Sequence, residues 1–360
     1  MKKINRISII LLAVAIFNCD QPTEDLLTDG DYQVVFSSKR EGGWGGWDIY
    51  ALNLSGIGLQ RLTEENGDDI VYTGGLSVGT QKIVFSSTRD NSRYQIYIMD
   101  SDGSNQTLLS TDPNVDDNYP RFTPDGLRIV FASNREGRYD IFSMDVAGNN
   151  LVNLTASPAY HEKNPMVSPD GTKILFTRSI LDTIRHKNMY LDQPYLMNID
   201  GSNLVDLGRA EYFGPAIRFA PNMEYIIFHG GLIGYRNTDI YRVDLATLEI
   251  TQLSNSSFSE YATDISPDSR KIAYHRADEY GGHMVYIIDA DGSNRKILTY
   301  GLDSRDAYFT PKGDKLIYST NIEGPYNIYK MDIDGSAPER ISNHRAEADY
   351  RVVGNFIGVQ

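Results

Sequence analysis

The chain of 360 residues has one cysteine and comparatively few basic residues. Its lone thiol, Cys19, has no partner for an internal disulfide. Lysine and arginine total 34 against 48 acidic residues, which gives a net charge of −14 at pH 7. No run of basic residues supplies the positive surface that nucleic-acid binding needs, and an anionic membrane surface would repel the folded domain. We therefore expect no nucleic acid among its partners.

Long hydrophobic runs are also missing. The apolar stretch at residues 7–17 is too short to span a bilayer as a helix, but it follows three basic residues as the core of a signal peptide does. Cys19 comes directly after this core, and a cysteine in that place resembles a bacterial lipoprotein signal, in which it becomes the lipidated first residue. Asn18 departs from the small residue that usually precedes it. The order of these features predicts export.

Three segments follow from this interpretation. We expect residues 1–18 to be a lipoprotein signal peptide, residues 19–30 a lipidated flexible tether, and residues 31–360 a propeller domain. Residues 1–18 carry three positive charges and no negative one, so their removal takes the net charge from −14 to −17. Membrane attachment then rests on lipid at Cys19 alone. We expect an envelope location in the outer membrane, facing the periplasm or the cell surface.

The folded part repeats one pattern seven times. Each copy has a short β-run that ends in an aromatic residue, then a loop, and then a second β-run rich in β-branched and aromatic residues. The first-run aromatics are Phe36, Phe85, Phe131, Phe176, Phe228, Tyr274 and Tyr318. Their spacing of 44 to 52 residues, with several strands in each unit, is typical of propeller blades. Four antiparallel strands make one blade.

Turn residues separate the strands at regular places. A Pro-Asp-Gly turn at residues 123–126 recurs at residues 168–171 and, with changes, in later copies. Asp-Gly pairs, such as Asp102-Gly103 and Asp334-Gly335, follow the third strands and predict tight hairpins. The chain is therefore expected to be all-β.

The repeats closely resemble those of the TolB-type β-propeller family. Residues 131–135 (FASNR) and residues 98–105 (IMDSDGSN) match the consensus of that family almost letter for letter, and the resemblance covers essentially all of residues 31–360. It implies a β-propeller that serves as a binding platform. Because propellers have many functions, the resemblance specifies the architecture better than the activity.

The ends of the repeat region predict how the ring closes. Residues 31–63 supply the second, third and fourth strands of a blade but no first strand, whereas residues 347–353 have first-strand character with no blade after them. We expect this C-terminal strand to complete blade one, which gives seven blades and leaves no open edge. Six or eight blades remain alternatives, because residues 356–359 could form a further strand.

Two motifs that suggest chemistry have structural interpretations. Residues 75–79 (GLSVG) match the nucleophile elbow of hydrolases, but that motif requires a strand followed by a helix, and in the repeat Ser77 falls where a turn begins. The Asp-Gly loops lack the glycine and glutamate positions of a calcium-binding loop. Arg40, Arg89 and Arg135 recur in register, so we expect them to make structural ion pairs or caps between blades.

All six histidines map to one face of the predicted ring or to its rim. His229 and His275 occupy the same position in consecutive blades, and His161 and His283 lie near the same face. If a metal is bound at all, His229 and His275 are its expected ligands. This arrangement resembles that of oligogalacturonate lyase, a seven-bladed relative with a histidine-bound metal, but the closely spaced histidines of that family have no counterpart here. Ordinary loop and packing roles are the alternative.

The longest insertions lie on the same face. Trp44 and Trp47 stand in a glycine-rich loop of blade one, where they either bind a ligand or fill a gap between blades. Residues 179–193, with Tyr190, and residues 230–237, with Tyr235, are expected to be irregular loops in blades four and five. The ligand-binding candidates are Trp44, Trp47, His161, Tyr190, His229, Tyr235, His275 and His283.

These observations predict a non-enzymatic, lipid-anchored envelope protein that acts as a monomer, has no cofactor, and binds a protein partner or a glycan on its propeller face. No complete set of nucleophile, base and stabilising group is present, so no catalytic residue is assigned. The alternative is a metal-dependent polysaccharide lyase of the oligogalacturonate type, or another glycan-active enzyme, that uses His229, His275 and carboxylates such as Glu162 and Glu260.

Overall fold

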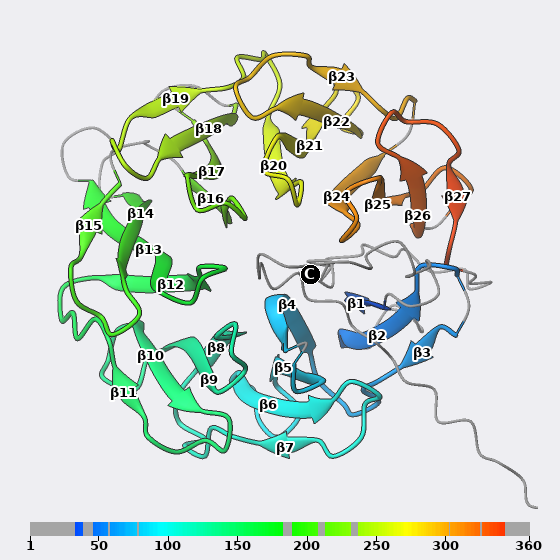
Figure 1. The fold of residues 1–360 in the computed structure, drawn as a ribbon. Helices are drawn as coiled ribbons and strands as arrows, with labels where there is room; N and C mark the ends of the chain where they lie inside the picture. The colour runs from blue at the N-terminus through cyan, green and yellow to red at the C-terminus, as the bar shows by residue number, and fades with distance from the viewer. Residues whose placement is uncertain are drawn as a thin grey trace, which may run out of the picture.

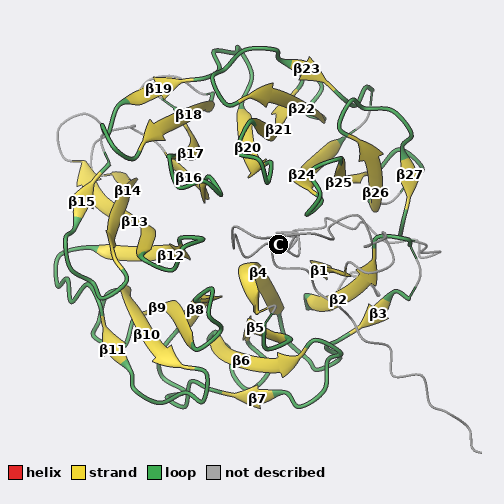
Figure 2. Cartoon of the chain, viewed as in Figure 1, coloured by secondary structure: helices red, strands yellow, loops and turns green. Residues whose placement is uncertain are grey.

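Seven β-sheets form a ring in the computed structural model of the protein, and each sheet is one blade (Figure 1). The structure describes residues 33–38, 46–56, 58–77, 79–182, 189–207, 213–231, 237–301, 303–324 and 326–342. These residues form strands, turns and loops (Figure 2), and within them no helix is long and apolar enough to cross a membrane. The predicted seven-bladed, all-β propeller is confirmed.

Within each blade, the strands are arranged side by side in order from the axis of the ring to its rim (Figure 1). The inner strands are β4 (Asp69–Ser77), β8 (Asp117–Phe122), β12 (His161–Val167), β16 (Phe213–Phe219), β20 (Glu260–Ile265) and β24 (Ser304–Phe309). The second strands are β1 (Gln33–Ser38), β5 (Lys82–Ser87), β9 (Arg128–Ser133), β13 (Lys173–Asp182), β17 (Tyr225–Gly230), β21 (Lys271–Ala277) and β25 (Lys315–Thr320). The third strands are β2 (Asp48–Asn53), β6 (Gln95–Asp100), β10 (Asp140–Asp145), β14 (Met189–Asn198), β18 (Asp239–Asp244), β22 (His283–Asp289) and β26 (Asn327–Asp332). The outer strands are β3 (Gln60–Arg61), β7 (Thr107–Leu108), β11 (Val152–Asn153), β15 (Val205–Asp206), β19 (Ile250–Gln252), β23 (Lys296–Ile297) and β27 (Glu339–Arg340).

Blade one differs from the other six in its described part. It has the order β1-β2-β3, and β1 corresponds to the second strand of the other blades, which pairs with an inner strand. The predicted closing strand at residues 347–353, and the possible further strand at residues 356–359, lie outside the described residues. Closure by the C-terminal strand therefore stays a prediction.

The hydrophobic core lies between the blades. Phe131 and Phe142 of blade three pack with Val84 and Ile96 of blade two in one buried cluster, and the other blade junctions repeat this arrangement. Within a blade, the aromatic residues of the second and third strands stack, as Phe85 does on Tyr97 with ring centroids 5.5 Å apart. Each blade is therefore stabilised by its neighbours, as in other repeat proteins.

The turns form as their residues predict. In the turn at residues 168–171, the Ser168 hydroxyl donates to Asp170 over 2.6 Å, and Gly171 takes a positive φ of 71°. Ser77 ends β4 and accepts a hydrogen bond of 2.7 Å from the Thr80 hydroxyl, and the next described residues, 79–81, form a turn that leads into β5. The described residues after Ser77 form a turn between two strands, where a nucleophile elbow needs a strand followed by a helix, so the interpretation as a turn holds.

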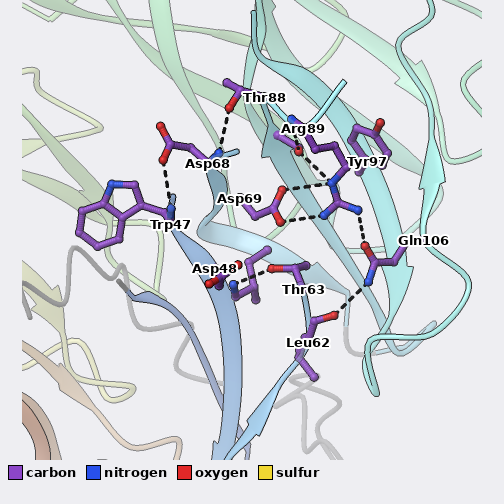
Figure 3. Close-up of polar contacts among 12 residues, drawn as sticks. Trp47, Asp48, Leu62, Thr63, Asp68, Asp69, Thr88, Arg89, Tyr97 and Gln106 are labelled. Atoms are coloured by element: carbon purple, nitrogen blue, oxygen red, sulfur yellow. Dashed lines mark hydrogen bonds and ion pairs between the residues drawn. The ribbon is translucent and has the colours of Figure 1, made fainter. Parts of the chain in front are cut away.

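The recurring arginines make ion pairs, but within a blade rather than between blades. Arg89 contacts the fully buried carboxylate of Asp69 over 2.8 Å and stacks on the Tyr97 ring (Figure 3). Arg135 and Asp117 repeat this pair in blade three over 2.9 Å. Gln106 is one of the links between blades one and two: its side chain accepts from Arg89 and donates to the Leu62 carbonyl over 2.9 Å (Figure 3). Arg40 lies outside the described residues.

The insertion at residues 179–193 is an extended hairpin, not the irregular loop that we predicted. β13 and β14 stay paired in register from Lys173↔Asn198 to Asp182↔Met189, and residues 183–188 lie outside the described residues. The reason is composition, since Ile180 and Leu181 continue the β-favouring pattern of the strand instead of ending it. The hairpin extends blade four beyond the length of its neighbours.

Candidate functional site

The two faces of the ring carry different structures. On one face the second strands end and the inner and third strands begin, as at Ala277, Glu260 and His283 in blade six. We call this the loop-bearing face. The opposite face carries the short Pro-Asp-Gly and Asp-Gly turns. Antiparallel pairing from axis to rim produces this separation in each blade.

Three histidines surround one tyrosine on the loop-bearing face, and we call them the histidine cluster. The ring of Tyr261, on β20, lies 5.2 Å from that of His229, 5.0 Å from that of His275 and 5.9 Å from that of His283, measured between centroids. The rings of His275 and His283 are 5.2 Å apart. The cluster thus joins blade five, through β17, to blade six.

Burial keeps two of these histidines neutral. His229 is 5% exposed, and burial, together with the nearby Arg218, lowers its pKa to about 4. Burial also lowers the pKa of His275 well below its usual range, with smaller contributions from His283 and His229. Neutral imidazoles can accept or donate hydrogen bonds but bring no positive charge to the site. The Nδ1 atom of His229 is buried without a hydrogen-bond partner among the described residues.

An acidic centre in blade seven extends the cluster. Nδ1 of His283 lies 3.0 Å from Asp303, which also pairs with Arg305 over 2.5 Å and accepts a hydrogen bond from the Tyr326 hydroxyl. Burial alone would raise the pKa of Asp303, but the hydrogen bonds from these three partners hold it well below its usual range. Asp303 therefore stays ionised and fixes the orientation of the His283 ring.

Exposed apolar side chains lie on the same face of blades six and seven. Tyr280, Tyr300 and Ile322 are 88%, 72% and 52% exposed, and each stands in a loop that joins strands at the loop-bearing face. Sequence reasoning did not single out these residues or Tyr261. Tyr261 stands directly opposite His275 in the pairing of β20 with β21, and only the structure gives this pairing.

The other predicted site residues are not part of this cluster as far as the structure describes them. His161 starts β12 and packs against Tyr139, with ring centroids 6.1 Å apart. Trp47 lies in blade one, where its backbone N–H donates to Asp68 (Figure 3). Tyr190 pairs with Leu181 in the extended hairpin, but its side chain is not described. Cys19, Trp44 and Tyr235 lie outside the described residues.

The described residues offer no ready metal centre. No group of three or more histidine, cysteine, aspartate or glutamate side chains in this part of the chain is arranged to hold a metal ion. The carboxylates named for the lyase alternative are already engaged, because Glu162 pairs with Arg178 and Glu260 with Arg295, both over 2.5 Å. These pairs hold inner strands in place at the face.

Comparison with known proteins agrees with the repeats and the fold. Residues 71–194 match the model of the TolB beta propeller domain. An uncharacterised protein of Agrobacterium fabrum is 32% identical over 138 residues, which is 37% of this chain and 45% of that protein, so the match spans less than half the length of this relative.

Among solved structures, the β-propeller domain of the Trilobed protease from Pyrococcus furiosus superposes with a TM-score of 0.64 at 13% identity, covering 88% of this chain and 96% of that one. TolB from Acinetobacter baumannii gives a TM-score of 0.52 at 18% identity, covering 94% and 88% of the two chains. At these identities the structural similarity concerns the fold alone, while the match of residues 71–194 confirms TolB-type repeats in the chain.

Proposed function

We propose that this seven-bladed propeller of TolB-type repeats is an exported, lipid-anchored envelope protein that binds a protein partner or a glycan on its loop-bearing face. The observation that carries the proposal is the concentration of aromatic and histidine side chains over blades five to seven. Tyr261 and His283 lie on this face, and the exposed rings of Tyr280 and Tyr300 stand in loops of the same face. Such side chains are common anchors in interfaces, and loops on a rigid scaffold are common sites of binding.

The charge of the site suggests which ligands it suits. The histidines at the centre of the cluster are neutral, Asp303 is ionised, and Arg305 neutralises it. A ligand would therefore meet aromatic rings and hydrogen-bonding groups rather than a strong field of one sign. Stacking on tyrosine and hydrogen bonding to imidazole suit both a sugar and a polar protein surface.

Binding should depend on the exposed tyrosines and not on the opposite face. Replacing Tyr280 and Tyr300 together by alanine should weaken capture of the partner from detergent-solubilised envelope, or binding to a glycan array, by roughly tenfold or more. The matched control is Leu127→Ala, because Leu127 is 61% exposed but lies in a turn of the opposite face. Equal binding by both variants and the wild type would contradict the proposal.

Lipid anchorage makes a separate prediction. Cys19→Ala should move the protein from the membrane fraction to the soluble fraction of fractionated cells, because one acyl-modified residue supplies the whole attachment. A Cys19→Ser variant should behave in the same way, since serine keeps the size but not the thiol. The anchor is ruled out if both variants stay with the membrane, or if the mature N terminus lies far from residue 19.

The glycan-active alternative is favoured by one observation, the pairing of His283 with Asp303 next to the Tyr261 ring. A histidine oriented by a carboxylate is a common general base. Incubation with acidic oligosaccharides, followed by ultraviolet absorbance for an unsaturated product, separates the two functions. Product formation that His283→Gln abolishes would establish the enzyme and overturn the purely binding role.

A further inference from the structure

Five inner-strand residues stand at one level around the axis of the ring. In blades three to seven, the inner strand shifts register once against the second strand. Beyond the shift, one inner-strand residue pairs with the residue that precedes the buried aromatic of the second strand. The pairs are Arg121↔Val130, Met166↔Leu175, Arg218↔Ile227, Asp264↔Ala273 and Tyr308↔Ile317. We call the inner-strand members of these pairs the axial tier. They come from blades three to seven, so the tier exists only when the ring is assembled (Figure 1).

Arg121 is buried without a counter-ion. This residue is 6% exposed, and within the described part of the chain its side chain donates one hydrogen bond, from Nη1 to the carbonyl of Pro120 over 3.2 Å. Nε is buried and has no partner among the described residues. The guanidinium lies 5.0 Å from the centroid of the Tyr72 ring. Gly74 leaves the space for this side chain, because a Cβ at that position would come within 2.9 Å of Cδ.

Arg218 repeats the situation from blade five. It is 7% exposed, its Nη1 donates to the carbonyl of Ile217 over 3.1 Å, and its Nε also lacks a partner among the described residues. Nη2 donates to the Thr73 hydroxyl over 3.2 Å, which joins β16 to β4 across the ring (Figure 1). The side chain of Tyr308 is also hydrogen-bonded to that of Arg218. The two guanidiniums are close enough that Arg218 contributes, after burial, to lowering the pKa of Arg121 to about 9.

Three half-buried arginines of neighbouring blades differ from Arg121 and Arg218 in having a carboxylate partner. Arg89, Arg135 and Arg178 each face a carboxylate on the inner strand of their own blade at 2.9 Å or less. No ion pair among the described residues involves Arg121 or Arg218. Buried charges are ordinarily paired, since an isolated charge in a low-dielectric interior is costly. The two neighbouring guanidiniums, which repel each other, therefore have no carboxylate at ion-pairing distance among the described residues.

One acidic group of the tier is nearby but does not fill this role. Asp264 accepts a hydrogen bond of 2.9 Å from the backbone N–H of Phe309, and burial raises its pKa to about 6. It lies near Arg218, and Tyr72, Tyr119, Tyr308 and the neutral His229 are the other titratable groups that face the two arginines. The two guanidiniums still outnumber the single carboxylate, and a ligand with one negative charge would balance the tier.

We propose that Arg121 and Arg218 together bind the carboxylate group of a small ligand at the axis of the ring. The unpartnered Nε atoms and the remaining Nη protons supply charge-assisted donors of the kind that pair with planar carboxylates. The hydrogen bond from Arg218 to Thr73 already links blades five and two at this level, so the proposed ligand is a single carboxylate group beside it. The two arginines are not members of the histidine cluster, although Arg218 lies near His229, and their site does not depend on a partner of the loop-bearing face.

Acetate and acetamide are the direct probes, because they share size and shape and differ in charge. Thermal unfolding of the full chain, at ionic strength held constant with chloride, should shift upward with acetate and not with acetamide, since a ligand of the native state stabilises it. Arg121→Met and Arg218→Met should each weaken acetate binding at least about tenfold. The control is Arg242→Met, which removes a guanidinium from the third strand of blade five, away from the axis.

Two further comparisons keep the test independent of misfolding. Asp264→Asn should strengthen acetate binding, because it removes the competing negative charge, whereas a folding defect would weaken it. Galacturonate and N-acetylglycine then show whether a sugar acid or a peptide terminus is the better source of the carboxylate. An acetate shift that persists in both arginine variants, or equal shifts from acetate and acetamide in the wild type, would overturn the proposal.

Discussion

Removal of residues 347–360 is expected to lower the melting temperature by roughly 10 °C or more, whereas removal of residues 20–29 should change it by less than roughly 2 °C. The described part of blade one has three strands, and β1 has no inner strand beside it there. Yet Val34 and Phe36 of β1 are buried in a cluster that also contains Tyr308 and Ile317 of blade seven. An unpaired β1 would expose its backbone edge where the ring must close.

Differential scanning calorimetry on both truncated proteins measures this effect. The shorter deletion is the matched control, because it also removes a terminal segment but one that we expect to be a tether. Light scattering should show that only the protein without residues 347–360 aggregates on heating. Equal melting temperatures would exclude the C-terminal strand as the element that completes blade one.

Arg89→Met should destabilise the protein by about 3–5 kcal/mol, because it leaves the Asp69 carboxylate buried without its counter-ion. The Asp69 side chain is 0% exposed and that of Arg89 is 9% exposed, so water can replace little of the lost interaction. The substitution also removes the hydrogen bond to Gln106, which connects blade two to Leu62 of blade one (Figure 3). Urea denaturation of the purified variant measures the change in the free energy of unfolding.

Two further variants identify the cause. Arg93→Met removes a partner of the more exposed ion pair with Asp116 and should cost less than about 1 kcal/mol. The double variant Asp69→Asn with Arg89→Met should be more stable than Arg89→Met alone, because it no longer buries an unpaired charge. If Arg89→Met and Arg93→Met lose the same stability, burial of the pair is not the reason for its effect.

Local patterns predicted most of the architecture from the sequence. The spacing of the aromatics from Phe36 to Tyr318 predicted seven blades, and the Pro-Asp-Gly and Asp-Gly pairs predicted the turns. These features succeed because hairpin pairing and turn geometry depend on neighbouring residues. Residues 179–193 make blade four longer than the other repeats, and for this reason we predicted an irregular loop. The prediction was wrong, because Ile180 and Leu181 continue the strand.

The candidate sites depend on contacts between blades that are far apart in the sequence. His229 and His275 were predicted from their equivalent positions, but Tyr261, whose ring contacts both, became evident only from the packing of β20. The same holds for Arg121 and Arg218, which appear in the sequence as ordinary polar residues of two inner strands.

The sequence by itself thus determined the number of repeats and their strands and turns. It also predicts a lipoprotein-like N terminus. Only the tertiary structure decided which side chains meet. Closing the ring brings Arg121, Arg218 and Thr73 together from three blades, at a level set by the register shift in each inner strand. Strand pairing within a repeat is a local property, whereas the arrangement around the axis depends on how all seven blades pack.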